Sequence, residues 1–420
     1  MKACFASTDI LLPSDDIDLS KWAVIACDQY TSQPDYWEKA EKIVGESPSA
    51  LRIIFPEVYL EREDAKERIR RIQESMLQYL EKGVLIPSIK DGFVLVERRL
   101  SCGVRKGLVG CLDLEAYDFR PEKKALVRAT EQTIASRIPP RVQIRQGAAL
   151  ESPHIMLLID DPKNSLIEPL YEKRSSLKQV YDIELMLGGG HITGYAVEGE
   201  AAERLNAQLY ERQKASDGFF LAVGDGNHSL ATAKTCWEQL KTTLSETERE
   251  NHPARYALVE LVNLHDESLE FEPIHRVMFH TDKKTVVSEF INTLKEQGMD
   301  CDTGDSITFL DGNGREGYDL FNTADRIPVD VLQMFLDEYL ARHKESAIDY
   351  VHGTDAVEEI VQKDNCVGIV LSAISKASLF PAIRSGGVLP RKTFSMGEAY
   401  EKRYYLECRS VEEQTGSDLC

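Results

Sequence analysis

The most constraining feature of this sequence is an apolar run that passes through a glycine-containing turn directly into a helix. Residues 219–223 read Phe-Phe-Leu-Ala-Val, a continuous apolar run typical of a strand buried on both faces. Gly224-Asp-Gly226 follows, and residues 229–243 form the next expected helix. Glycine permits tight backbone angles, so the strand can turn sharply at this point. A strand joined directly to a helix favours an α/β fold.

The rest of the chain repeats this mixture of strands and helices. Apolar or alternating runs predict strands, and segments with one apolar stripe predict helices. The expected strands are 93–100, 107–114, 154–159, 256–263 and 271–279, and the expected helices are 61–82, 198–214, 283–297 and 328–344. We therefore expect a mixed sheet flanked by helices, in more than one lobe sharing contacts.

No linker or repeat divides the chain, so we treat residues 1–420 as one unit. Within it we expect a functional core at 125–285, an N-terminal lobe at 1–124 and a C-terminal lobe at 286–420.

Charge and composition exclude several classes of partner. With 50 basic and 70 acidic side chains, the formal charge is −20, which repels nucleic acid and anionic lipid. A run of about 18 apolar residues is missing, and so is an apolar leader, which predicts a cytoplasmic protein without membrane spans. The nine cysteines form no Cys-x-x-Cys pair, so we expect reduced thiols rather than zinc or disulfides. The expected partner is a small molecule, and the oligomeric state stays open.

The turn after residue 223 is the strongest candidate for chemistry. Asn227 or Ser229 can cap the helix, and the free N–H groups of its first turn suit a phosphate. His228 adds a donor or a proton carrier near neutral pH. The alternative interpretation is a helix cap with a buried histidine. The phosphate-binding candidates in this segment are Gly224, Asp225, Gly226, Asn227, Ser229 and Lys234.

A basic segment at residues 141–145 lies within the predicted functional core. Residues 141–145 alternate as in a half-buried strand, and Pro139-Pro140 is expected to break any helix there. Arg141 and Arg145 would then point to the same side, where their forked guanidinium groups suit phosphate or carboxylate. The alternative is a solvated strand face or ion pairs with the acidic excess.

Two carboxylates follow the apolar strand at 154–159. Asp160 and Asp161 are candidates to hold Mg²⁺ together with water. Equally, aspartates often begin a turn before a proline, which here is Pro162.

Several motifs in combination resemble one large prokaryotic family, the domain-of-unknown-function family number one thousand and fifteen. The resemblance covers essentially the whole chain. It rests on residues 22–30, Arg128-Ala-Thr-Glu131, Ile138-Pro-Pro-Arg-Val-Gln-Ile-Arg145, Asp225-Gly-Asn-His-Ser229 and Phe271-Glu-Pro-Ile-His-Arg276.

The family's usual turn reads Asp-Gly-His-His-Arg and is similar to turns of the sulfiredoxin and ParB-like nucleotide-binding group, which includes free-serine kinases. His228 matches that pattern, whereas Asn227 and Ser229 depart from it and remove one charged phosphate ligand. The resemblance implies a nucleotide site at this turn. It also implies a glutamate base, which we carry to Glu131.

The sequence leads to a hypothesis of an ATP-type nucleotide-binding enzyme. It would transfer a phosphoryl group to a small hydroxyl compound, with free serine as the leading acceptor and Mg²⁺ as the accompanying ion. Glu131 and His228 are the catalytic candidates. A non-catalytic sensor or scaffold that binds a nucleotide or anion is the alternative, and a hydrolase of a phosphorylated metabolite is the third possibility.

Overall fold

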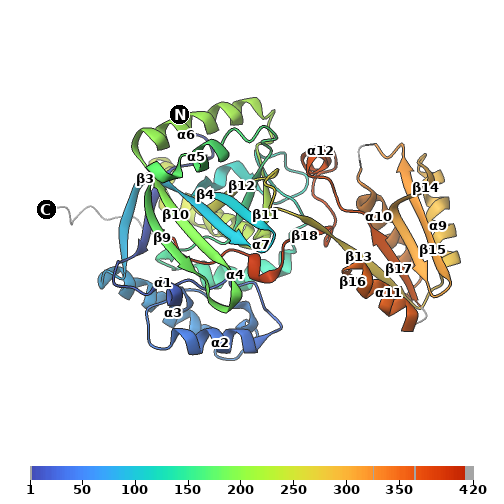
Figure 1. The fold of residues 1–420 in the computed structure, drawn as a ribbon, viewed down its shortest axis with the longest axis horizontal. Coiled ribbons are helices and arrows are strands. Elements are labelled where there is room, and N and C mark those ends of the chain that lie inside the picture. Colours follow the sequence, from blue (N-terminus) through green and yellow to red (C-terminus); the bar gives the residue numbers. More distant parts are fainter. Residues whose placement is uncertain (1, 325, 364–365, 412–420) are drawn as a thin grey trace. The chain divides into compact units, whose positions relative to one another are not determined.

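The computed structural model describes residues 2–324, 326–363 and 366–411, which form two compact units (Figure 1). Of the described residues, the first unit contains 2–129, 133–269 and 398–411, and the second contains 130–132, 270–324, 326–363 and 366–397. The chain thus leaves the first unit, builds the second, and returns to the first.

The first unit is built on a large mixed sheet with strand order β5-β6-β11-β8-β12-β4-β3-β10-β9, in which β1 also pairs with β4 and β2 with β3. The strands are β1 (Phe5–Ala6), β2 (Thr8–Pro13), β3 (Leu85–Leu100), β4 (Gly103–Asp113), β5 (Tyr117–Asp118), β6 (Val127–Ala129), β8 (Met156–Ile159), β9 (Lys178–Glu184), β10 (His191–Val197), β11 (Leu221–Asp225) and β12 (Tyr256–Asn263). A small separate sheet pairs β7 (Leu150–Glu151) with β19 (Arg409–Ser410).

Helices cover this sheet because its strands are apolar on both faces. Along β3, Phe93 and Leu95 belong to one core cluster and Val94 and Val96 to another, as alternating side chains require. The helices are α1 (Leu19–Trp22), α2 (Pro34–Val44), α3 (Ala65–Glu81), α4 (Ile138–Arg145), α5 (Glu168–Glu172), α6 (Gly199–Ala215), α7 (Asn227–Leu240) and α8 (Glu246–Asn251). Residues of α6 and α7 pack in the core of Phe93, and residues of α2 and α3 in the core of Val94.

The second unit has its own sheet, ordered β15-β14-β17-β13-β16, with β18 paired to β13. Its elements are β13 (Phe271–Phe279), α9 (Lys283–Glu296), β14 (Asp300–Asp311), β15 (Gly314–Phe321), α10 (Pro328–Arg342), β16 (Ala347–His352), α11 (Thr354–Lys363), β17 (Cys366–Leu371), α12 (Lys376–Gly386) and β18 (Phe394–Met396).

These elements confirm the expected mixed α/β class, but the segment at 141–145 is helical. The alternating pattern was therefore read with the wrong period. Pro139 and Pro140 lie in the first turn of α4, where a missing N–H and a fixed φ favour a helix start. Among the described residues, no helix has the length and apolar character to cross a bilayer.

Candidate functional site

The predicted turn lies where one strand of the sheet comes close to the start of its neighbour. β11 ends at Asp225, and Gly226 adopts a left-handed conformation with φ of +77° before α7 begins. A Cβ atom on Gly226 would lie 3.0 Å from the Cα of Ile155, just before β8. Both the positive φ and this approach favour glycine. No side chain of the described residues caps α7, so its first N–H groups face the turn without a side-chain acceptor.

Asp225 is held as a carboxylate at the end of β11. One carboxylate oxygen accepts from the Gly226 N–H at 2.8 Å, and the other lies 3.0 Å from the ammonium of Lys402. Burial alone would raise the pKa of Asp225, but Lys402 and the Gly226 amide outweigh it and lower the pKa below the usual value. The aspartate therefore fixes the turn rather than serving as a proton donor.

A histidine that sequence reasoning missed reaches Ser229 across the sheet. Nε2 of His154 lies 2.6 Å from Oγ of Ser229, and Nδ1 lies 2.9 Å from the hydroxyl of Tyr405. The backbone N–H of Cys27 donates to the same Tyr405 hydroxyl at 3.1 Å. Hydrogen bonds thus connect the hydroxyl of Ser229 to His154 and His154 to Tyr405, a group that can orient the histidine.

His228 is uncharged at neutral pH. Burial, helped by the nearby guanidinium groups of Arg141 and Arg137, lowers the pKa of His228 to about 4. Its Nε2 accepts a hydrogen bond from the N–H of Ile134 at 3.2 Å. His228 can therefore donate through Nδ1 at neutral pH, but it adds no positive charge for a phosphate, and its role as a proton carrier stays a prediction.

A cavity of about 140 Å³ opens beside Ser229 and His154. Arg141 and Arg145 line this cavity, as two arginines of one segment were expected to share a site, but they do so from helix α4 rather than from a strand. Both are paired. Arg141 Nε donates to Glu57 at 2.7 Å and its Nη2 contacts the other oxygen, while Arg145 lies 2.5 Å from Glu151. Burial raises the pKa of Glu57, although Arg141 acts against the shift.

Lys234, one of the predicted phosphate-binding residues, has other partners. Its ammonium donates to the carbonyl of Leu114 at 2.9 Å and pairs with Glu238 at 2.6 Å. Since Lys234 is buried by these contacts, we leave it out of the site proposed below.

The aspartates predicted to hold Mg²⁺ lie at the other end of the strands. β8 runs antiparallel to β11, so Ile159 pairs with Leu221, whereas Met156 pairs with Asp225. The carboxyl end of β8, with Asp160 and Asp161, therefore lies away from the turn, and their role as metal ligands stays a prediction.

Local contacts explain both aspartates without a metal. Asp161 accepts from the backbone N–H groups of Ser165 and Leu166 at 2.7 and 2.9 Å, and Asp160 lies 2.7 Å from Nε2 of His265. In the described part of the chain, no group of three or more His, Cys, Asp or Glu residues could hold a metal ion.

Glu131 is assigned to the second unit, whereas the other predicted site residues belong to the first. Its backbone forms an isolated bridge with Leu389. Burial lowers the pKa of Arg276 to about 10, and the carboxylate of Glu131 acts against that shift. The role of Glu131 as a base stays a prediction.

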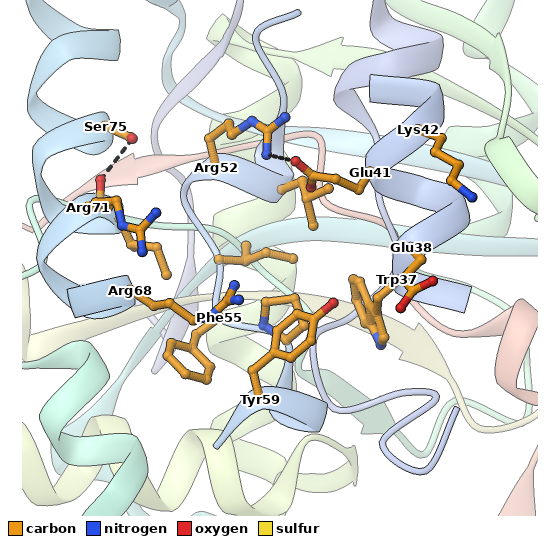
Figure 2. Close-up of a pocket in the computed structure, with 14 residues that line it drawn as sticks. Trp37, Glu38, Glu41, Lys42, Arg52, Phe55, Tyr59, Arg68, Arg71 and Ser75 are labelled. Carbon is orange, nitrogen blue, oxygen red and sulfur yellow. Dashed lines mark hydrogen bonds and ion pairs between the residues drawn. The ribbon is translucent and has the colours of Figure 1, made fainter. Parts of the chain in front are cut away.

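A larger cavity, of about 690 Å³, lies between α2 and α3 (Figure 2). Two of its arginines are paired: Arg52 lies 2.5 Å from Glu41, and Arg68 lies over the ring of Tyr59 and pairs with Asp64 at 2.8 Å. We find no nucleophile paired with a base among its lining residues, so the smaller cavity is the better candidate for chemistry.

Sequence reasoning found the turn but not the residues that face it from elsewhere. His154, Glu57, Lys402 and Tyr405 lie far from residues 225–229 in the chain. Only His154 gave a signal, as a polar residue that opens an otherwise apolar run.

Comparison with known proteins identifies a family without an assigned activity. The family described as "Protein of unknown function (DUF1015)" matches residues 11–373. Among curated proteins, none matches the sequence.

Solved structures are similar only at a low level. A free serine kinase in complex with AMP has a TM-score of 0.37 at 11% identity and covers 70% of this chain and 89% of its own. A conserved hypothetical protein from Pyrococcus furiosus scores 0.34 at 10% identity and covers 72% and 94%. SbnI from Staphylococcus aureus, truncated at its C-terminus, scores 0.35 at 9% identity and covers 69% and 82%. At these TM-scores the likeness carries no argument about the site.

Proposed function

The chain belongs to the DUF1015 family of proteins of unknown function, and from that premise we propose that its turn at residues 225–229 binds the phosphates of a nucleotide. The proposed reaction is transfer of a phosphoryl group to a small hydroxyl compound, with free serine as the first acceptor to test. One observation carries the proposal: Gly226 brings the open N-terminus of α7 to the edge of a cavity that contains a hydroxyl and a histidine.

The physical support comes from the needs of phosphoryl transfer. Such reactions depend on positioning and charge stabilisation more than on covalent chemistry by the protein. The first N–H groups of α7 supply donors and the positive end of a helix dipole. Arg137 and Arg141 add positive potential at His228, in a chain whose overall charge is −20.

The residues proposed to hold phosphate are Gly224, Asp225, Gly226, Asn227 and Ser229, with Arg141 and Arg145 as cationic neighbours. His228 is the proposed proton carrier, and Glu131 remains the proposed base for the acceptor hydroxyl. Because Asp160 and Asp161 are engaged elsewhere, we derive no step through Mg²⁺.

An isosteric charge change tests the phosphate site. Asn227 is the first residue of α7, where a negative charge favours the helix but repels a bound phosphate. We expect Asn227→Asp to remain folded and to weaken binding of ATP and ADP by at least about tenfold, measured by calorimetry. Asn292→Asp, which adds the same charge at an exposed position on α9, should leave the affinity unchanged. Equal affinities in both variants and the wild type would reject the phosphate site.

Turnover assays separate the three functional hypotheses. A kinase consumes ATP only when the acceptor is present, so serine and other small hydroxyl compounds should stimulate ADP formation. Phosphate release without an acceptor would instead support the hydrolase. Binding without turnover across the acceptor panel would replace the enzyme by a nucleotide or anion sensor.

A further inference from the structure

Ser229 lines the cavity, and its hydroxyl contacts His154, which is the arrangement that a nucleophilic serine needs. The distance of 2.6 Å between Oγ and Nε2 of His154 is short enough for direct proton transfer. Serine is a weak nucleophile unless a neighbouring base accepts its proton. The pair therefore meets the first geometric condition for covalent catalysis.

Tyr405 meets the second condition, which is a group that orients the base. Its hydroxyl lies 2.9 Å from Nδ1 of His154 and accepts a hydrogen bond from the backbone N–H of Cys27 at 3.1 Å. Burial raises the pKa of Tyr405 well above its usual value, so the phenol stays neutral. When Tyr405 accepts from Nδ1–H, Nε2 keeps its lone pair and faces the hydroxyl of Ser229.

Two carboxylates, each paired with a cation, interact with the charge of His154. They are Asp225, paired with Lys402, and Glu57, paired with Arg141. An imidazolium formed by proton transfer from Ser229 would thus interact with both ion pairs.

The size of the cavity limits what reacts there. A cavity of about 140 Å³ is similar in volume to one of about 150 Å³ that binds benzene, so it has room for a phosphoryl group but not for a whole nucleotide. A nucleotide would have to place its terminal phosphate inside and its base and sugar outside. Ser229, in the first turn of α7, is then the hydroxyl nearest to the proposed phosphate position.

We propose that Ser229 is a covalent phosphoryl acceptor and His154 its general base, so that transfer proceeds through a phosphoserine enzyme. This inference rests on the proposed function and names the reacting residue of the same site. Oγ of Ser229 attacks the terminal phosphorus of the donor, and its proton passes to Nε2 of His154. The bond between that phosphorus and the bridging oxygen breaks, and the nucleoside diphosphate leaves with the electron pair.

The second half of the reaction restores the enzyme. The acceptor hydroxyl attacks the phosphorus of phosphoserine and loses its proton to Glu131, the base proposed for the acceptor. The bond from Oγ of Ser229 to phosphorus breaks, and Oγ recovers its proton from His154. Water in place of the acceptor would give the phosphate release expected of a hydrolase.

The full-length protein allows a direct test. It is incubated without acceptor, either with ATP labelled on the terminal phosphate or with acetyl phosphate, and is quenched in acid. Peptide mass spectrometry should place an acid-stable phosphoryl group on Ser229. The wild type should also exchange label between ADP and ATP without an acceptor, which requires a covalent intermediate even when little of it accumulates.

Matched variants separate the roles. Ser229→Ala should abolish labelling and exchange, and His154→Gln should slow both at least about 100-fold. Tyr405→Phe tests a positioning residue, and it should slow labelling and also shift its pH profile, which a packing defect alone would not do. Thr235→Val removes another α7 hydroxyl, which donates to the Ala231 carbonyl at 2.8 Å, and should label normally.

The possible failures are distinct. If neither donor labels Ser229 and no label exchanges between ADP and ATP, or if the label lies on a histidine and is acid-labile, the inference is wrong. If Ser229→Ala turns over ATP and acceptor at the wild-type rate, the inference is also wrong, but the proposed function stands. If the protein neither binds nor consumes nucleotide but acetyl phosphate labels Ser229, the nucleotide function fails and the nucleophile is supported.

Discussion

Gly226 combines a backbone conformation and a close contact that both disfavour a larger residue. Its φ is +77°, and a Cβ would meet the backbone of Ile155 at 3.0 Å. Gly218 has nearly the same φ, +76°, but a Cβ there would have no neighbour within 4 Å. The two glycines therefore separate the cost of the backbone angle from the cost of the contact.

We expect Gly226→Val to abolish nucleotide binding while α7 remains formed. Gly218→Val should cost about 1–2 kcal/mol of stability from its positive φ and leave affinity unchanged. Titration calorimetry and circular dichroism measure the two effects. Wild-type affinity for every nucleotide and anion in Gly226→Val would remove the phosphate site.

Glu131 tests the proposed base in the second unit. Glutamine keeps the shape and removes the charge, so Glu131→Gln should bind nucleotide nearly as well as wild type but turn over at least about 100-fold more slowly. Glu272→Gln changes an exposed glutamate on β13 and should leave turnover intact. Unchanged turnover in Glu131→Gln, with an acceptor that works, would keep the enzyme class and reject the base.

At the scale of elements, α4 shows how a short helix is anchored beside the site. Arg141 contacts both carboxylate oxygens of Glu57, and the two side chains are only 14% and 12% exposed. Removing one partner of such a buried pair leaves the other charge without compensation.

We expect Arg141→Met to lower the free energy of unfolding by about 3 kcal/mol. Arg70→Met, which removes exposed ion pairs with Glu67 and Glu74 on α3, should change it by less than about 1 kcal/mol. Urea unfolding at neutral pH compares the two. Adding Glu57→Gln to Arg141→Met should recover part of the loss, because the unpaired carboxylate is then removed. Equal losses for the two arginines would show that the buried pair contributes nothing special.

At the scale of the whole molecule, the division of the chain predicts which part can fold alone. Every strand of the second sheet lies between residues 271 and 396, and β13 pairs with β16, β17 and β18. A fragment of residues 270–397 keeps all these pairings. A fragment of residues 286–420, the lobe expected from the sequence, lacks β13.

We expect the 270–397 fragment to unfold cooperatively in urea and the 286–420 fragment to show no cooperative transition, because its sheet lacks a strand that holds three others. Tryptophan is confined to positions 22, 37 and 237, so circular dichroism is the suitable probe. A cooperative transition in the 286–420 fragment, or the lack of one in the 270–397 fragment, would contradict the proposed division.

Local pattern determined the elements and the central turn of this protein. Strands at 256–263 and 271–279, the helix after residue 227 and the glycine turn before it follow from short-range periodicity and backbone freedom, which neighbouring residues largely set. The same reasoning misread residues 141–145, because a short segment fits both periods and the two prolines can start a helix as well as break one.

Only the tertiary structure decided which residues share the site. The antiparallel pairing of β8 with β11 puts His154 at the turn and Asp160 at the opposite end, whereas a parallel pairing would reverse them. Tyr405 and Lys402 reach the same turn from the return of the chain after residue 397. Strand direction and chain return depend on long-range packing, which no local pattern in the sequence records.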